Sequence, residues 1–316
     1  MLSASPATLS LFQRTHESRV VAHTVERRVC TFCATAVEPS QVENVAVPSN
    51  VRAFKHETFH VWRCPQCRSL HCLEVVDLAR YYENYPIPRR LSPVIRIALD
   101  NQISRLVAHG LAAESRVLDY GCGYGLFLER MKERGFLNVT GYDPYSSNPA
   151  FHDRALVASR FDAIVLQDVI EHVEDPRAVL AEVDAALSPG GVVMIGTPEA
   201  GGIALTRPKK YWMQLHPPYH LHIYTRAALE QLGHERGWTV EECYNRPYYD
   251  TRTPGLNSRA IDKYKWFHDG TLDALQEPVD ERRLRGSIRF MFLARFGYWF
   301  KRAGEVALLF RKPLTV

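Results

Sequence analysis

Three side chains that could carry acid–base or metal chemistry lie within five residues in the stretch LQDVIEHVEDP (166–176). They are Asp168, Glu171 and His172. A histidine can act as a general base near neutral pH, and carboxylates together with imidazoles can bind a divalent ion. The same trio is equally compatible with a strand end at which Glu171 caps a turn and His172 packs. The stretch by itself leaves these three interpretations open.

A second group of candidate residues lies in YWMQLHPPYHLHIYT (211–225), which contains His216, His220 and His222. Three imidazoles within seven residues predict that at least one serves as a base or as a metal ligand. We assign candidate catalytic roles to His172, His220 and His222. A catalytic ion, for which Mg²⁺ is the candidate, requires a histidine of this segment to reach the ion that Glu171 and His172 bind, at about 2.3 Å or less.

Four cysteines form two C-x2-C pairs, CTFC and CPQC, with 30 residues between them. Each pair points two thiolates at one point, and two pairs close a tetrahedral site for Zn²⁺. The intervening segment is rich in Val, Phe and Thr, which favours short strands. The pattern predicts a zinc ribbon with a structural zinc, because four thiolates leave no open position for catalysis. The predicted ligands are Cys30, Cys33, Cys64 and Cys67.

The stretch SRVLDYGCGYGLFLERMKERG (115–135) has the pattern of a strand, a glycine-rich turn and a helix. Gly121 and Gly123 allow the backbone to approach a ligand closely. The next expected strand, NVTGYD, ends at Asp143, 22 positions after Gly121. A glycine turn after one strand and an acid at the end of the next are typical of nucleoside sites in doubly wound sheets. Leu126 stands where a dinucleotide fingerprint needs its third glycine, so NAD is disfavoured.

The motif VLDYGCGYG resembles the first motif of class I S-adenosylmethionine (SAM) methyltransferases, in which an acid at the strand end precedes G-x-G-x-G. The similarity continues through FDAIVLQDVIEHVEDP, RAVLAEVDAALSPGGVVMIGTP and AGEVALLFRKP, over about residues 94–312. The resemblance implies an α/β fold with a doubly wound, Rossmann-like methyltransferase sheet and an antiparallel last strand. It also implies a set of SAM-binding residues, namely Asp119, Gly121, Gly123, Asp143 and Gln167.

The spacing acid-x-x-Glu-His resembles that of ubiquinone-pathway O-methyltransferases and small-RNA 3′-end methyltransferases, where such residues bind a metal that lowers the pKa of a substrate hydroxyl. The zinc ribbon ahead of YYENY is also similar to the N-terminal module of some bacterial sugar C-methyltransferases. We therefore expect methyl transfer to oxygen or carbon of a small-molecule or sugar-type substrate, in a biosynthetic pathway. One departure is the segment 144–160, whose 17 residues leave little room for the helix and third strand of the family.

The predicted organisation includes a helical insertion at about 250–302, before the last strand. Its second expected helix, DERRLRGSIRFMFLARFGYWFKRAG (280–304), is basic and aromatic. We expect it to cap the active site or to form a homodimer contact, and a membrane surface is the less favoured partner. The expected regions are a flexible leader (1–26), the zinc ribbon (27–76), a linker with a lead helix (77–110) and the SAM-binding methyltransferase domain (111–316).

Composition restricts the class of partner. The net charge is +4, from 39 basic and 35 acidic residues, which disfavours nucleic acid. A nucleic-acid or protein methyltransferase that uses the ribbon for recognition is therefore the second hypothesis, and a non-catalytic SAM-binding protein is the third. No apolar run reaches the roughly 20 residues of a membrane-spanning helix. Seven cysteines, of which the first four are paired in knuckles, favour a reducing cytoplasm.

Overall fold

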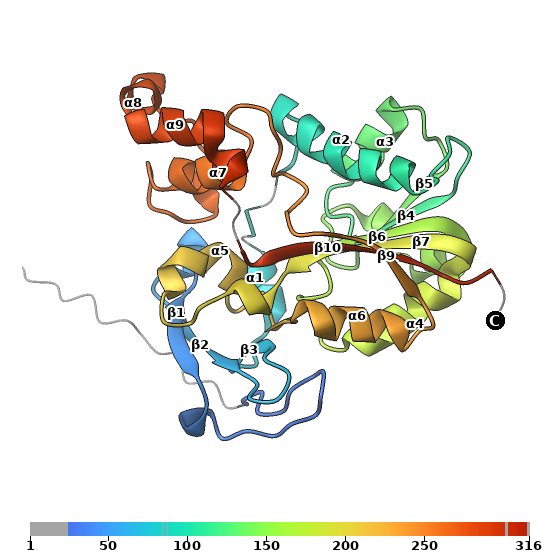
Figure 1. Cartoon of the computed structure of the whole chain (residues 1–316), viewed down its shortest axis with the longest axis horizontal. Coiled ribbons are helices and arrows are strands. Elements are labelled where there is room, and N and C mark those ends of the chain that lie inside the picture. The colour runs from blue at the N-terminus through green and yellow to red at the C-terminus, as the bar shows by residue number, and fades with distance from the viewer. Residues whose placement is uncertain (1–24, 84, 87, 301–302, 315–316) are drawn as a thin grey trace, which may run out of the picture.

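The main sheet of the molecule has six strands in the order β5-β4-β6-β7-β10-β9 (Figure 1). The computed structural model describes residues 25–83, 85–86, 88–300 and 303–314, so all but the last two residues of the expected leader lie outside the described residues. The first four strands of that order are parallel, and β10 is antiparallel to both β7 and β9. This confirms the predicted doubly wound sheet with an antiparallel last strand. The strands are β4 (Val117–Tyr120), β5 (Val139–Tyr142), β6 (Phe161–Gln167), β7 (Leu187–Pro198), β9 (Thr239–Tyr244) and β10 (Glu305–Arg311).

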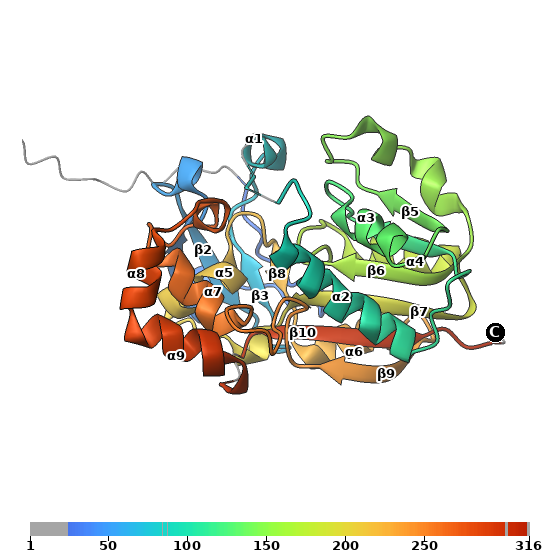
Figure 2. The same ribbon diagram turned by 90° about the horizontal axis from the view of Figure 1, so that it is seen from above.

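Helices cover both faces of this sheet (Figures 1 and 2). On one face lie α2 (Pro93–Ala108) and α3 (Leu126–Glu133), and on the other lie α4 (Pro176–Ala186) and α6 (Arg226–His234). Each pair packs its own apolar cluster against the strands. Burial on both faces explains why the central strands have nearly continuous apolar sequences.

Helices α4 and α6 each begin at a residue whose side chain caps the helix. The side chain of Asp175 accepts from the amide of Ala178, with Pro176 at the first position of α4. Thr225 caps α6 in the same way, through the amide of Ala228. A side-chain acceptor followed by a helix former or proline fixes where a helix starts. The caps therefore fix where the loops 168–175 and 216–225 end.

The segment between β5 and β6 contains two 3-10 helices (Pro149–Phe151 and Arg154–Ala158) and no strand. The sheet consequently ends at β5 on this side. This agrees with the expectation that 17 residues are too few for a full helix and a third strand.

A second, antiparallel sheet has the order β1-β2-β3-β8. Three of its strands belong to the expected ribbon, namely β1 (Asn44–Pro48), β2 (Thr58–Arg63) and β3 (Leu70–Cys72). The fourth, β8 (His222–Ile223), comes from the histidine-rich segment and pairs with β3. The sequence did not predict this pairing. The ribbon sheet is thus completed by a strand from the expected SAM-binding domain.

The insertion contains α7 (Ser258–Lys265), α8 (Glu281–Gly286) and α9 (Ile288–Phe296). The single basic, aromatic helix that we expected is two helices, because Ser287 ends α8 and its side chain caps α9. No residue of α9 is buried, and Ile288 is 87% exposed. The aromatic side chains of α9 are therefore not covered by the rest of the described chain, and both the cap and the subunit contact stay predictions. The remaining helices are α1 (Leu78–Tyr82), α5 (Trp212–Leu215) and the 3-10 turns Pro39–Gln41, Arg52–Phe54, Ala200–Gly202, Pro208–Tyr211, Asp273–Gln276 and Gly297–Trp299.

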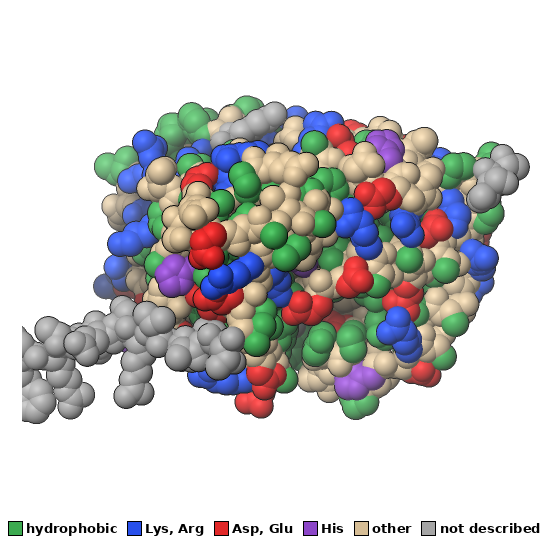
Figure 3. All heavy atoms as spheres, turned by 90° about the horizontal axis from the view of Figure 1, so that it is seen from below, with side chains coloured by type: hydrophobic (Ala, Val, Ile, Leu, Met, Phe, Trp, Pro, Cys, Tyr) green, Lys and Arg blue, Asp and Glu red, His purple; other side chains and the backbone are tan. Residues whose placement is uncertain are grey.

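Basic and acidic side chains are interspersed on the face shown in Figure 3. No extended patch of one sign is visible there, as a nucleic-acid groove would require. Among the described residues, no helix has the length and apolar character needed to cross a membrane.

Candidate active site and cysteine cluster

The four predicted zinc ligands come together in the ribbon. Their sulfur atoms all lie within 4.8 Å of one another. The Sγ atoms of Cys30 and Cys67 are 3.5 Å apart, as are those of Cys33 and Cys64. Tetrahedral zinc with sulfur ligands at about 2.3 Å requires sulfur–sulfur distances of about 3.8 Å. The donor set therefore fits a closed tetrahedral zinc site.

This cysteine cluster is bonded to the expected SAM-binding domain. The guanidinium of Arg177, on α4, donates to the backbone carbonyls of Thr31 (2.9 Å) and Phe32 (3.0 Å) in the first knuckle. The hydroxyl of Thr31 lies 2.8 Å from the hydroxyl of Tyr224. The first knuckle is consequently part of the contact between ribbon and domain.

The loop after β6 turns sharply at Asp168, which has a φ of +54°. The left-handed conformation is costly for a residue other than glycine, and such strain is concentrated at functional sites. The Asp168 amide donates to the carbonyl of Gly196 on β7 (2.8 Å), which holds the turn. The turn leads Glu171 into the interior, where it is 1% exposed.

Glu171 has one oxygen satisfied and one free of hydrogen bonds. The hydroxyl of Thr197 donates to its Oε2 at 2.9 Å. Its Oε1 is buried without a hydrogen-bond partner among the described residues, and lies 3.9 Å from Nε2 of His220. A buried carboxylate oxygen without a donor is costly, so a proton or a cation is expected beside it.

His220 presents an unprotonated nitrogen to this carboxylate. Its Nδ1 lies 2.7 Å from the carbonyl of Gln214. Because a carbonyl only accepts, Nδ1 carries the hydrogen and Nε2 keeps its lone pair. The rings of His220 and His172 are 4.7 Å apart. Ligand atoms of Glu171, His172 and His220 all lie within 4.8 Å of one another, and we call these three residues the EHH cluster.

In the EHH cluster a histidine from segment 216–222 lies beside Glu171 and His172, which is the arrangement that the predicted metal site needs. Asp168 is not part of it. His216 borders it, with its ring 4.9 Å from that of His220 and its Nε2 3.0 Å from the Tyr85 hydroxyl.

The structure does not bring His222 to the EHH cluster. Its Nε2 lies 3.2 Å from the carbonyl of Ile170, and its ring stacks on that of Tyr224. His71 of the ribbon faces it, with 6.3 Å between ring centroids. His222 therefore belongs to the contact between ribbon and domain.

Burial shifts the titration of the whole EHH cluster toward neutral forms. It raises the pKa of Glu171 well above its ordinary value, and nearby Asp168 adds to this shift. It lowers the pKa of His172 well below its ordinary value, with a contribution from His220. It lowers the pKa of His220 to about 4. The imidazoles are therefore neutral at pH 7, which is the state that binds a metal or accepts a proton.

Two tyrosines of the linker, which were not among the predicted site residues, complete the surroundings of the EHH cluster. The hydroxyl of Tyr82 lies 2.8 Å from Nδ1 of His172, and its ring stacks on Tyr145 at 5.4 Å. Tyr85 contacts His216 as described above. The only feature of the sequence that pointed to Tyr82 and Tyr85 was the concentration of tyrosines in YYENY.

The expected cofactor residues lie at the carboxyl ends of β4 and β5. Gly121 and Gly123 have φ values of +83° and +54°. A Cβ on Gly121 would lie 2.4 Å from Cγ2 of Val169, in the loop that leads to the EHH cluster. Asp143 accepts from the amide of Gly123 at 2.8 Å. Burial raises the pKa of Asp119 to about 7, and nearby Asp143 contributes.

Gln167, the last residue of β6, is held beside Asp168. Its Nε2 donates to the Asp168 carboxylate at 3.1 Å, and its Oε1 accepts from Gln102 of α2 at 3.3 Å. A Cβ on Gly196 would overlap with the side-chain amide of Gln167. The glycine in β7 thus leaves space for Gln167 at the edge of the sheet where the cofactor residues lie.

Comparison with known proteins supports this architecture. Residues 95–243 match the family model described as a methyltransferase domain. A ubiquinone biosynthesis O-methyltransferase from Aeromonas salmonicida (strain A449) is 28% identical over 40% of this chain and 64% of its own length. One of the same name from Psychrobacter cryohalolentis is 33% identical over 28% of this chain and 42% of its own length. The chain thus spans less than two thirds of the length of each of these two relatives.

Among solved structures, phosphoethanolamine N-methyltransferase 2 from Haemonchus contortus is similar, with 14% identity, a TM-score of 0.46, and coverage of 89% of this chain and 72% of that one. Residues 95–243 thus match a methyltransferase domain, and the sheet has the Rossmann-like arrangement with an antiparallel last strand that is expected of class I SAM-dependent methyltransferases.

Proposed function

We propose that this protein transfers a methyl group from SAM to a hydroxyl oxygen of a small-molecule or sugar-type substrate in a biosynthetic pathway. The observation that carries the proposal is the EHH cluster, whose Glu171 and His172 follow β6 in the loop that packs on Gly121, an expected cofactor residue. In open α/β sheets, ligands bind at the carboxyl ends of the strands. The names of the curated relatives favour oxygen over carbon as the acceptor.

The cofactor roles follow from chemistry and position. The ribose hydroxyls of SAM would donate to Asp143, and the methionine part would pass along the backbone of Gly121 and Gly123. Asp119 is buried, and its carboxylate would be stabilised by the ammonium group of SAM. Gln167 lies at the same edge, where its amide can contact the cofactor.

The EHH cluster would hold a divalent ion. The free Oε1 of Glu171 and the Nε2 lone pair of His220 fit this role, and the Nδ1–H of His220 bonded to a carbonyl is the usual support for a metal-bound imidazole. Such an ion would lower the pKa of a bound substrate hydroxyl. Two imidazoles and one carboxylate suit Zn²⁺ or Mn²⁺ better than Mg²⁺, which prefers oxygen ligands. Without an ion, His172 would act as the general base, oriented by Tyr82.

A structural Zn²⁺ bound by the four ribbon cysteines is the second metal that we propose. Its support is the closeness of the sulfur atoms and the contact of the knuckle with Arg177. Four thiolates would leave this ion no catalytic position.

Methyl transfer from radiolabelled SAM to a panel of catechols, phenols and sugar nucleotides tests the proposal. We expect transfer to at least one hydroxyl acceptor, loss of activity with a chelator, and recovery with one of Mn²⁺, Zn²⁺ or Mg²⁺. Glu171→Gln should lower kcat by about 10²–10⁴-fold, on the scale of a lost catalytic group. Glu129→Gln, which changes an exposed acid on α3, is the matched control and should leave kcat unchanged.

Three results would contradict parts of the proposal. Full activity of Glu171→Gln in the presence of a chelator would remove the metal role. Transfer to carbon acceptors alone would remove the assignment to oxygen. SAM binding without transfer on the whole panel would favour a non-catalytic SAM-binding protein.

A further inference from the structure

A pocket of about 460 Å³ lies between α2 and the end of β9, and none of its lining residues belongs to the EHH cluster or to the expected cofactor set. Ser104 and Arg105 line it from α2, Asn245 and Arg246 from the segment after β9, and Tyr298 from the insertion. The lining residues include two guanidinium groups and no carboxylate. Arg246 is paired with Asp250, which does not line the pocket, so the uncompensated positive charge is that of Arg105.

Arg105 lacks an acceptor among the described residues. Its Nη1 is buried and has no hydrogen-bond partner there, and its guanidinium lies over the ring of Tyr244, 4.1 Å from the centroid. Ring stacking occupies a face of the guanidinium but leaves its in-plane hydrogens unsatisfied. Burial lowers the pKa of Arg105, and nearby groups, among them Glu242 and Asp250, only partly offset this effect. An unpaired buried charge is costly, so an anionic acceptor is expected here.

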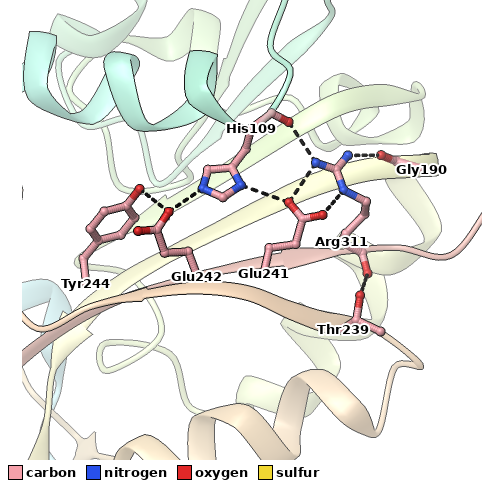
Figure 4. A network of polar contacts seen from close by, with 7 residues as sticks. All are labelled: His109, Gly190, Thr239, Glu241, Glu242, Tyr244 and Arg311. Carbon is pink, nitrogen blue, oxygen red and sulfur yellow. Dashed lines mark hydrogen bonds and ion pairs between the residues drawn. The ribbon is translucent and has the colours of Figure 1, made fainter.

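The carboxylates near Arg105 are engaged elsewhere. Glu242 accepts from the Tyr244 hydroxyl at 2.6 Å and lies 2.7 Å from Nε2 of His109 (Figure 4). Asp250 accepts from Arg246 at 2.6 Å and from the amide of Ser258 at 3.0 Å. Neither forms an ion pair with Arg105, so an anion from outside the chain would be its first direct acceptor.

Arg246 is a second cation at the pocket, and it is held in place. Its guanidinium lies 4.0 Å from the centroid of the Tyr298 ring, and its Nη1 donates to the Tyr298 carbonyl at 2.8 Å. Guanidinium groups held in fixed orientations bind phosphate and carboxylate through paired N–H donors. The volume of the pocket exceeds that of a phosphate group. A small molecule that carries such a group therefore fits.

We propose that this pocket binds a small molecule through its phosphate or carboxylate group, with Arg105 as the principal ligand and Arg246 as the second. The site is separate from the methyl-transfer site and does not depend on the function proposed above. Asn245 and Ser104 offer neutral polar contacts to the uncharged part of the molecule.

Calorimetric titration of the full chain with inorganic phosphate and with glucose 1-phosphate tests the proposal. We expect millimolar or tighter binding that persists with saturating S-adenosylhomocysteine. Arg105→Gln should weaken it about 10- to 100-fold, the effect of losing one or two charge-assisted hydrogen bonds. The matched control is Arg116→Gln, because Arg116 also lies over an aromatic ring, that of Phe161, but does not line the pocket. Arg116→Gln should bind both probes with the affinity of the unaltered chain.

A second readout separates a ligand site from a structural role for Arg105. In the absence of anions, Arg105→Gln should melt at or above the temperature of the unaltered chain, because an uncompensated charge is removed. It should also lose the rise in melting temperature that phosphate gives to the unaltered chain. If Arg105→Gln does not fold, Arg105→Lys replaces it as the test. Lysine keeps the charge and loses the paired N–H donors, so this variant should bind both probes more weakly than the unaltered chain does.

Three results would overturn the proposal. They are the absence of binding of both probes, an unchanged affinity in the Arg105 variants, and complete competition by S-adenosylhomocysteine, which would assign the binding to the cofactor site.

Discussion

Each side chain of the EHH cluster is oriented by a neutral partner from a different part of the chain. Thr197, on β7, holds one oxygen of Glu171, and Tyr82, on α1, contacts His172. The Gln214 carbonyl fixes the tautomer of His220. Such partners orient metal ligands and tune their basicity. The chemistry of the cluster therefore depends on residues that carry no charge.

Thr197→Val tests this dependence on the partner of Glu171. The substitution keeps the shape of the side chain and removes the hydroxyl that donates to Oε2. We expect the affinity of the zinc-loaded protein for Mn²⁺ to fall by about 10–100-fold, as for other supporting residues of metal sites. Thr239→Val is the control, because the Thr239 hydroxyl is exposed and donates to the Arg311 carbonyl at 3.4 Å, away from the EHH cluster (Figure 4). Equal Mn²⁺ affinities in the two variants would exclude a supporting role for Thr197.

Asp119 predicts a pH dependence of SAM affinity. Its pKa is raised by burial from 3.8 to about 7, so the folded protein retains a proton that the unfolded chain has already released. Stability that depends on this group therefore falls as the pH rises from about 4 to about 7. The carboxylate that can pair with the SAM ammonium group forms only at the upper end of this range. We expect SAM affinity to increase between about pH 6 and pH 8.

Calorimetry of SAM binding across this range, with Asp119→Asn as the comparison, measures the effect. The variant should bind more weakly at pH 8 and show little change with pH, because its amide does not titrate. An affinity of the unaltered chain that is constant over the whole range would contradict the assignment of Asp119.

At the scale of elements, the loops after β4 and β6 pack directly on each other. Gly121 has both a left-handed φ and a contact with Val169 that leaves no space for a Cβ. The glycine thus lets the cofactor turn and the loop that leads to the EHH cluster approach closely. This gives the G-x-G spacing a packing role in addition to its role toward the ligand.

A comparison of Gly121→Ala with Gly237→Ala separates the cost of the left-handed backbone from the cost of the contact with Val169. Gly237 has a φ of +76°, but nothing lies within 4 Å of the point that a Cβ would occupy there, so alanine costs only backbone strain of about 1–2 kcal/mol. At Gly121 we expect the free energy of unfolding to fall by about 1–3 kcal/mol more, because of the clash with Val169. Urea denaturation measures both variants. A loss at Gly121 no larger than that at Gly237 would show that the two loops are free to move apart.

Most of the main sheet could be predicted because its signals are local. Apolar strands, glycine turns and a capping Asp175 before Pro176 are all readable over a few residues. The sequence favoured His220, but the exclusion of His222 from the EHH cluster was not readable, because it depends on the pairing of β8 with β3, and a two-residue strand has no pattern of its own. The break between α8 and α9 at Ser287 was missed because the apolar and basic residues continue across it.

Over the whole molecule, backbone hydrogen bonds link the ribbon to the active-site loop. The amide of Cys72, at the end of β3, donates to the carbonyl of Leu221 at 3.0 Å. The amide of Leu221 donates in turn to the carbonyl of Glu171 at 2.8 Å. Arg52 of the ribbon also forms ion pairs with Asp269 and Glu277 of the insertion. The ribbon is therefore a structural support of the candidate active site.

Loss of the ribbon zinc should consequently affect methyl transfer. Cys64→Ser removes one of the proposed ligands, and because metal binding and folding are coupled, we expect loss of zinc and a lower melting temperature. We also expect at least a tenfold loss of activity, about 1.4 kcal/mol in transition-state stabilisation. Cys243→Ser, at a cysteine outside the cluster, is the control and should retain zinc and activity. A zinc-free Cys64→Ser variant with full activity would contradict the supporting role.

The pairing of β3 with β8 also has a consequence for synthesis of the chain. β3 ends at Cys72, and its partner strand begins at His222, so about 150 residues are translated before the outer edge of β3 can be covered. An uncovered strand edge is a template for pairing with other chains. In a nascent chain the buried, apolar β3 would be exposed throughout that interval, and binding of zinc by the two knuckles would be the early event that keeps the half-built sheet together.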